Sequence, residues 1–248
     1  MPEEFELERA FNLDQIVKLL NNFEERLSRV KIKNQLNITL NDTQEALDYG
    51  IDEGVLKKNR ENRYYAIRDF KIREDKFYPA VRKGLKQLWT KDGFKEAEFH
   101  IETTAGKRTK IVGRWTRPDL TLVSHKKFAW TIGHEFDVVT FEIKRPDSCD
   151  VLAVFEALSH ATAATRTYVV FPVNEDDWSR QNQDQEARVK DECSRHGVGL
   201  ILIEDIYRDP KPKLIIKAIK REIDHERCSD FLEAVMPEAV KANISAWK

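Results

Sequence analysis

Two carboxylates and a lysine lie near the middle of the chain, in segments that are typical of β-strands. Asp119 belongs to the segment 117–123 (RPDLTLV), and Glu142 and Lys144 belong to the segment 136–146 (FDVVTFEIKRP). Both segments are rich in β-branched and aromatic residues, which predicts strands. Because side chains alternate along a strand, Glu142 and Lys144 should share one face, while the apolar residues between them face a core.

These residue types suggest metal-assisted hydrolysis. A charged group on a largely buried strand is costly unless it is paired or bound to a metal ion. Asp119, Glu142 and the carbonyl of Ile143 offer the hard oxygen ligands that Mg²⁺ or Mn²⁺ takes. Lys144 would lie beside a metal-bound water, where its ammonium can orient the nucleophile or stabilise developing negative charge. The alternative is a structural salt bridge between Glu142 and Lys144.

The motif resembles the PD-(D/E)xK nuclease superfamily, which includes many restriction enzymes. The matching residues are the Pro-Asp pair at 118–119 and the Glu-Ile-Lys triplet at 142–144. The segments 151–172 and 189–205 then predict helix, strand, helix and strand, which is the order of that superfamily's core. The resemblance covers about residues 71–205. It implies an α/β fold with a restriction-endonuclease-like mixed central sheet flanked by helices.

The resemblance also implies roles for residues around the motif. An acidic residue is expected on the helix before the first core strand, and Glu74 is the best positional match for this catalytic role. The alternative for Glu74 is a stabilising position near the helix N-terminus. His160 and Arg166 are expected to point toward the site or to have surface roles. His125 and His134 are expected in a loop between the two motif strands.

The first 70 residues predict a separate domain. Apolar spacing predicts a helix over 13–29, a short second helix, and a third helix over 40–54 with Asn41 as its N-cap. A strand, a polar turn and a second strand follow over 55–67. This order resembles a small N-terminal winged helix-turn-helix domain, so we predict domains at residues 1–70 and 71–248.

Basic residues suggest where nucleic acid would bind. Residues 71–145 carry 17 basic and 10 acidic side chains, so the segment with the carboxylate motif is positive. The third helix of the first domain is acidic, which leaves open whether residues 1–70 bind DNA through the wing or bind a protein partner. The candidate phosphate-binding residues are Lys57, Lys58, Arg60 and Arg63 in the wing, and Lys107, Arg108, Lys110, Arg114 and Arg117 near the motif.

Composition fits a globular protein. The 248 residues are 41% hydrophobic and 34% charged. They contain no apolar run of about 18 residues, so we expect no membrane interaction. Three widely spaced cysteines argue against a disulfide framework and favour a reducing, cytoplasmic location. The C-terminal helical segments would cap the core or pack in a homo-oligomer.

We therefore expect a metal-dependent nuclease that hydrolyses DNA phosphodiester bonds with Mg²⁺ or Mn²⁺ in a defence or repair system. One alternative is a DNA- or protein-binding module with a catalytically silent nuclease fold. Another is a nuclease subunit that is active only with a partner ATPase, because the chain has no GxxxxGK[ST] pattern of its own.

Overall fold

The computed structural model describes residues 2–23, 25–107 and 117–247. The chain forms two compact units, Met1–Phe77 and Tyr78–Lys248. The division falls after Phe77, whereas the sequence placed the boundary after residue 70. The short 3₁₀ helix η1 (Glu74–Phe77) therefore belongs to unit 1.

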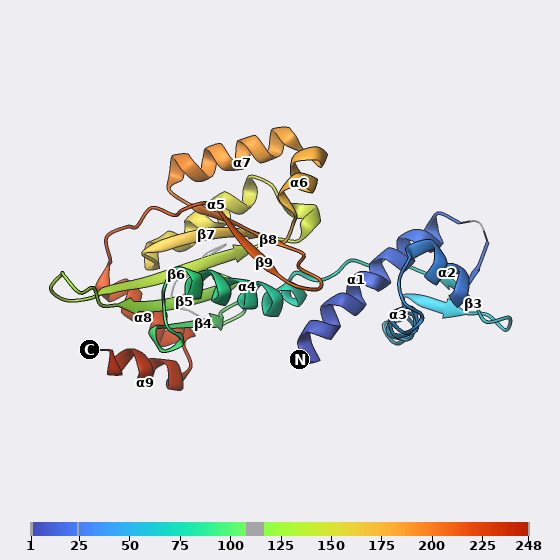
Figure 1. The fold of residues 1–248 in the computed structure, drawn as a ribbon, viewed down its shortest axis with the longest axis horizontal. Helices are drawn as coiled ribbons and strands as arrows, with labels where there is room; N and C mark the ends of the chain where they lie inside the picture. Colours follow the sequence, from blue (N-terminus) through green and yellow to red (C-terminus); the bar gives the residue numbers. More distant parts are fainter. Residues whose placement is uncertain (1, 24, 108–116, 248) are drawn as a thin grey trace. The chain divides into compact units, whose positions relative to one another are not determined.

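Unit 1 combines helices with a three-stranded antiparallel sheet of order β1-β3-β2 (Figure 1). Apolar side chains from the helices and the sheet pack together, among them Leu13, Ile16 and Leu47, which are fully buried. The elements are α1 (Pro2–Asn21), β1 (Leu27–Ser28), α2 (Arg29–Leu36), α3 (Leu40–Asp52), β2 (Leu56–Lys58) and β3 (Arg63–Ala66).

Two details of unit 1 differ from the sequence prediction. The first helix ends at Asn21 rather than at residue 29, because buried Leu27 pairs with Tyr64 in a strand. The N-cap of α3 is Thr39 and not Asn41: the Thr39 hydroxyl accepts a hydrogen bond from the amide of Asp42 at 3.1 Å. The cap is the residue that precedes the first helical turn, and α3 already begins at residue 40.

Unit 2 is built on a six-stranded mixed sheet of order β4-β5-β6-β7-β8-β9. The pairs β6–β7 and β7–β8 are parallel, and the other neighbours are antiparallel. The strands are β4 (Phe99–Thr103), β5 (Leu120–Lys126), β6 (Glu135–Ile143), β7 (Arg166–Phe171), β8 (Gly199–Glu204) and β9 (Lys211–Ile216).

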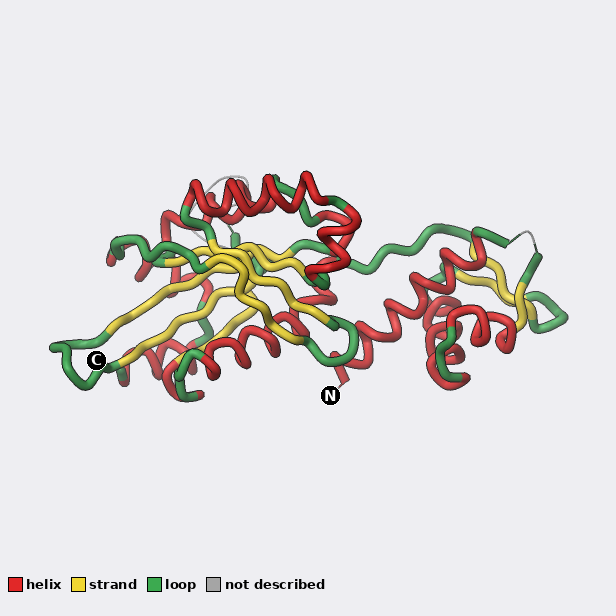
Figure 2. Tube along the Cα trace, turned by 45° about the horizontal axis from the view of Figure 1, so that its top comes forward, coloured by secondary structure: helices red, strands yellow, loops and turns green. Residues whose placement is uncertain are grey.

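Helices lie around this sheet, as the red and yellow segments of Figure 2 show. The chain is therefore a mixed α/β protein, as predicted. The remaining elements of unit 2 are α4 (Tyr78–Lys91), η2 (Glu96–Glu98), η3 (Pro146–Ser148), α5 (Leu152–Ser159), η4 (His160–Ala163), α6 (Glu175–Gln181), α7 (Gln183–His196), α8 (His225–Val235) and α9 (Glu238–Ala246).

The alternation of side chains gives the sheet two buried faces. On one face Val169 and Phe171 pack with apolar residues of α5 and α7. On the other face the ring of Phe141 lies 5.7 Å from Trp89 of α4 and 5.8 Å from Tyr168. A strand that is covered on both faces reads as a nearly continuous apolar run, which explains why β6 was recognisable in the sequence.

Three predictions for unit 2 were wrong in their limits. Strand β5 continues to Lys126, so His125 is a buried strand residue rather than a loop residue; the ladder with β6 extends as far as the Lys126–Glu135 pair. The helix expected to reach residue 166 ends at Ser159 and is followed by η4. The polar segment 174–187 contains α6 and the start of α7.

No helix in the described ranges is both long and apolar enough to cross a membrane. The cysteines Cys149, Cys193 and Cys228 are all buried and free.

Candidate active site

The antiparallel hairpin of β5 and β6 brings Asp119 and Glu142 together. Leu120, the first residue of β5, pairs with Phe141 near the end of β6. Extending this ladder by one position places Asp119 opposite Glu142, with both side chains on the face covered by α5. Both residues are buried, with relative exposures of 8% and 7%.

Asp119 is held by two hydrogen bonds. Its Oδ2 accepts from the amide of Ile143 at 2.8 Å, and its Oδ1 accepts from the hydroxyl of Tyr78 at 2.5 Å. Burial raises the pKa of Asp119, and the hydrogen bonds from Tyr78 and Ile143 oppose that rise. The side chain is therefore fixed in one orientation before any ligand binds.

Lys144 lies between two carboxylates. Its Nζ is 2.6 Å from Oε1 of Glu142, and it also forms an ion pair with Glu156 of α5. The side chains of Glu142 and Lys144 thus share one face, as the alternation predicted. The Lys144 amide donates to the carbonyl of Val170 in β7, which anchors the backbone just beyond the end of β6.

The cluster has more negative than positive charge. Among the described residues, Asp119, Glu142 and Glu156 surround one ammonium group, that of Lys144. Burial, followed by the charge of Asp119, raises the pKa of Glu142 to about 9. The cluster therefore holds a proton at neutral pH instead of a third negative charge. His160 also faces it, with Nε2 3.7 Å from Oε2 of Glu142.

This donor set fits a hard divalent cation, which would take the place of that proton. Asp119 and Glu142 would hold Mg²⁺ or Mn²⁺, both of which prefer carboxylate oxygens. In the described part of the chain, no three His, Cys, Asp or Glu side chains are already arranged as a metal cage. Instead, the Lys144 ammonium donates a hydrogen bond to Oε1 of Glu142. For Ile143, the structure records a contact of its amide with Asp119, and the role predicted for its carbonyl stays a prediction.

Glu156 and Tyr78 are members of the cluster that were not identified from the sequence as site residues. Glu156 lies in the last turn of α5, four positions before His160, the C-cap residue of that helix, so the two side chains are on the same side. The spacing is visible in the sequence, but the prediction included only the histidine of this pair. Tyr78 begins α4, 41 positions before Asp119, and no local pattern connects the two residues.

The other predicted residues have varied surroundings. Glu74 is half-buried in η1 of unit 1, and its catalytic role stays a prediction. Arg166 does not point to the site, because its guanidinium pairs with Asp137 and donates to the carbonyl of Ala218. His134 is exposed, and its ring centroid lies 4.6 Å from that of buried His125, with the two rings tilted by 55°.

The predicted phosphate-binding residues divide into three groups. The wing residues are all exposed on or beside the β2–β3 hairpin; they are Lys57, Lys58, Arg60 and Arg63. Near the motif, Arg117 is exposed, whereas Lys107 donates to the carbonyl of Val235 at the end of α8. Arg108, Lys110 and Arg114 lie outside the described residues.

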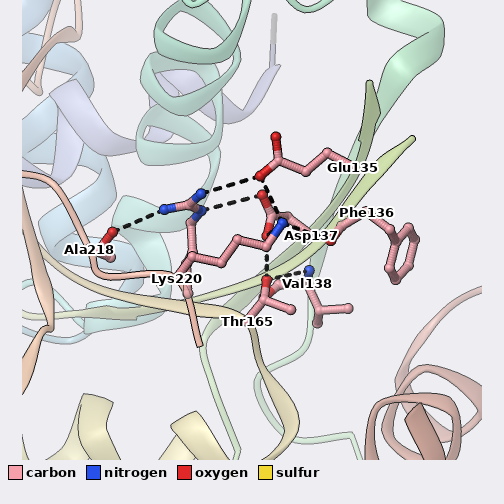
Figure 3. Close-up of polar contacts among 8 residues, drawn as sticks. Glu135, Phe136, Asp137, Val138, Thr165, Ala218 and Lys220 are labelled. Carbon is pink, nitrogen blue, oxygen red and sulfur yellow. Dashed lines mark hydrogen bonds and ion pairs between the residues drawn. The ribbon is translucent and has the colours of Figure 1, made fainter. Parts of the chain in front are cut away.

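A second charged cluster lies at the opposite end of β6 (Figure 3). Lys220 contacts Glu135 at 2.7 Å and Asp137 at 3.1 Å, and Thr165 donates to Asp137 at 2.7 Å. Arg166 supplies a second cation. Glu135 is seven residues from Glu142, which is about 23 Å along a strand, so the two clusters are separate. This cluster joins β6, β7 and the segment after β9.

The sequence matches no protein-family model, and no curated protein is significantly similar to it.

Proposed function

We propose that this chain is a metal-dependent nuclease that hydrolyses phosphodiester bonds in DNA. The observation that carries the proposal is the buried cluster in which Asp119 and Glu142 lie opposite each other and Lys144 bridges to Glu156. The element order α4, β4–β6, α5 and β7 agrees with a restriction-endonuclease-like fold for unit 2. The helix and strand order of unit 1 likewise agrees with a winged helix domain.

Each residue would have a distinct role. Asp119 and Glu142 would hold Mg²⁺ or Mn²⁺, which when bound polarises the phosphate and lowers the pKa of a water. Tyr78 and the Ile143 amide keep Asp119 in its orientation. Lys144 would orient the attacking water, or donate to a phosphate oxygen as negative charge develops.

Glu156 is the best structural candidate for a third acidic role. It contacts Lys144, and its hydrogen bond to Glu142 helps to raise the pKa of that carboxyl. Its position lets it hold the Lys144 ammonium in reach when Glu142 turns to a metal ion. The sequence assigned the third carboxylate to Glu74, and that assignment stays a prediction.

A cleavage assay tests the proposal directly. Linear and circular DNA would be incubated with the chain in Mg²⁺, Mn²⁺ or EDTA, beside Asp119→Asn and Lys144→Ala. The matched control is Asp137→Asn, because Asp137 is as buried as Asp119 but belongs to the second cluster. We expect metal-dependent cleavage that both site variants lose and the control keeps.

Other outcomes point elsewhere. Cleavage that persists in Asp119→Asn would show that the cluster is not the active site. No cleavage by the unmodified chain with either metal would refute an autonomous nuclease. A partner that restores cleavage would then support the ATPase-linked subunit, and metal-independent DNA binding alone would support the silent binding module.

We also propose that unit 1 contacts DNA through its wing. The β2–β3 hairpin presents the exposed cations Lys57 and Lys58 on one strand and Arg63 on the next. The exposed face of α3 carries Glu45 and Asp48, which disfavours insertion of that helix into a groove. Replacing both lysines by glutamine should weaken DNA binding and lower the slope of log K against log[salt] by about 2. An unchanged slope would favour a protein partner instead.

A further inference from the structure

Unit 1 contains a cavity of about 480 Å³ that the nuclease proposal does not use. It is formed by one side of α1, by the end of α3 and by the segment 68–76. Its volume lies within the roughly 300–1,000 Å³ range of small-molecule sites, and it is far larger than a single phosphate ion needs. Basic side chains outnumber acidic ones in its lining; the basic ones are Arg9, Arg68, Lys71, Arg73 and Lys76.

Arg9 presents an unsatisfied donor in this cavity. Its guanidinium lies over the ring of Tyr49, with Cζ 4.7 Å from the ring centroid. Its Nε is buried, and among the described residues it has no hydrogen-bond partner. A buried donor on a charged group is costly to leave unpaired, so this atom favours an anionic acceptor.

Arg68 adds a second guanidinium with no carboxylate partner in the described part of the chain. It donates to the carbonyls of Glu53 and Gly54, just beyond the end of α3, which fixes its position but leaves its charge uncompensated. Two acidic groups of the lining already have partners: Glu6 pairs with Lys76 at 2.8 Å, and Asp69 accepts from Asn21 at 3.1 Å. Arg73 is also paired, with Asp75 at 2.7 Å. In the described part of the chain, Arg9 and Arg68 are thus two guanidinium groups of the lining without an ion-pair partner, against one such carboxylate, Glu53.

From this geometry we infer that the cavity binds a phosphate-bearing organic anion of nucleotide size. Guanidinium groups suit phosphate oxygens because several N–H donors lie in one plane. The rings of Tyr49 and Phe70, edge to face at 6.2 Å, supply apolar wall for an organic group. The phosphate belongs either to a free nucleotide or to the end of a nucleic-acid strand. The inference concerns unit 1 alone and does not depend on the proposed nuclease site.

Calorimetric titration of the full chain tests this inference. The Asp119→Asn background with EDTA excludes cleavage and metal-bridged binding. The probes are ATP, AMP, adenosine, inorganic phosphate, and one oligonucleotide with either a 5′-phosphate or a 5′-hydroxyl. The variant is Arg9→Met, which keeps the length of the side chain. The control is Arg26→Met, because Arg26 stacks on Tyr65 at 4.5 Å in the same unit but does not line the cavity.

We expect a phosphate-bearing probe to bind, Arg9→Met to weaken its binding about tenfold or more, and Arg26→Met to change it less than twofold. Binding of ATP or AMP would identify a free nucleotide as the source. Binding of the 5′-phosphorylated oligonucleotide alone would identify a strand end. The inference is overturned if no phosphate-bearing probe binds at millimolar concentration, if adenosine binds as well as AMP, or if Arg9→Met has no effect. Circular dichroism of Arg9→Met ensures that lost binding does not reflect unfolding.

Discussion

Replacing Glu142 by glutamine should stabilise the folded chain in metal-free buffer while it abolishes hydrolysis. Burial and the charge of Asp119 raise the pKa of Glu142 from 4.5 to about 9. The unfolded chain releases this proton near pH 4.5, whereas the folded chain keeps it until about pH 9. The folded state therefore binds more protons across this window, and its stability falls as pH rises from 4.5 to 9. Glutamine is neutral throughout and removes this slope.

The size of the effect follows from the two pKa values. Each pKa unit corresponds to about 1.4 kcal/mol, so a rise from 4.5 to about 9 sets a ceiling of roughly 6 kcal/mol at pH 9. Because the folded Glu142 is already neutral in this pH window, glutamine loses no charge there, and the change in its hydrogen bonding with Lys144 costs about 0.5–1.5 kcal/mol. Less this cost, the ceiling on the net gain is about 4 kcal/mol at pH 8.5 and close to zero at pH 5.5, so the gain should grow as pH rises. For a chain of this size each kcal/mol raises Tm by roughly 2–4 °C.

Urea and thermal unfolding at pH 5.5, 7.0 and 8.5 in EDTA would measure the effect. Glu135→Gln is the matched control, because Glu135 lies on the same strand but pairs with Lys220 in the second cluster. The control should lose stability at every pH. If the unmodified chain and Glu142→Gln change in parallel with pH, the folded Glu142 is not holding a proton and the reasoning is wrong.

Three further predictions concern single side chains. Lys144→Ala should lower turnover strongly while Mn²⁺ binding, measured by equilibrium dialysis, stays nearly intact; loss of binding would mean that the lysine is needed to build the metal site. Tyr78→Phe removes one hydrogen bond to Asp119 and should cost about 1 kcal/mol of transition-state stabilisation, or several-fold in kcat, and an unchanged kcat would remove Tyr78 from the positioning role. Asp137→Asn weakens the cluster with Arg166 and should lower the urea-unfolding free energy by about 1–3 kcal/mol, with cleavage per folded molecule unchanged; a loss of cleavage there would couple the two clusters.

Strand alternation was sufficient to place Glu142 and Lys144 on one face, because the period of a strand is fixed by its backbone. Alternation alone could not predict that Asp119 lies close to Glu142. That proximity depends also on the antiparallel register of β5 and β6, which a long hairpin connects. Tyr78 could not be found in this way. Its contact with Asp119 depends on how α4 packs against the sheet, and tertiary packing is not encoded in any local period.

Helix limits were harder to predict than helix positions. Apolar spacing over residues 13–29 continued past Asn21 because Leu27 is buried in a strand, and a buried strand residue and a helix residue look alike in the sequence. Thr39 and Asn41 are both good N-cap residues. The structure decides between them, because the backbone of Thr39 has φ −71° and ψ 163°, the extended geometry of a cap. Ser28, which caps the preceding helix, has similar angles of φ −78° and ψ 158°.

Strand β6 carries two acid-base clusters, and their charge balance separates the candidate site from a structural network. At its beginning, Glu135 and Asp137 face Arg166 and Lys220, so the described charges are equal and the contacts are mutual. At its end, three carboxylates face one ammonium in the part of the chain that the structure describes, and the negative excess raises the pKa of Glu142. A balanced cluster gains nothing from a further cation, whereas an acid-rich buried cluster does. The same residue types in one strand thus point to different roles, and the unbalanced cluster is where a divalent ion and a phosphodiester would be expected to meet.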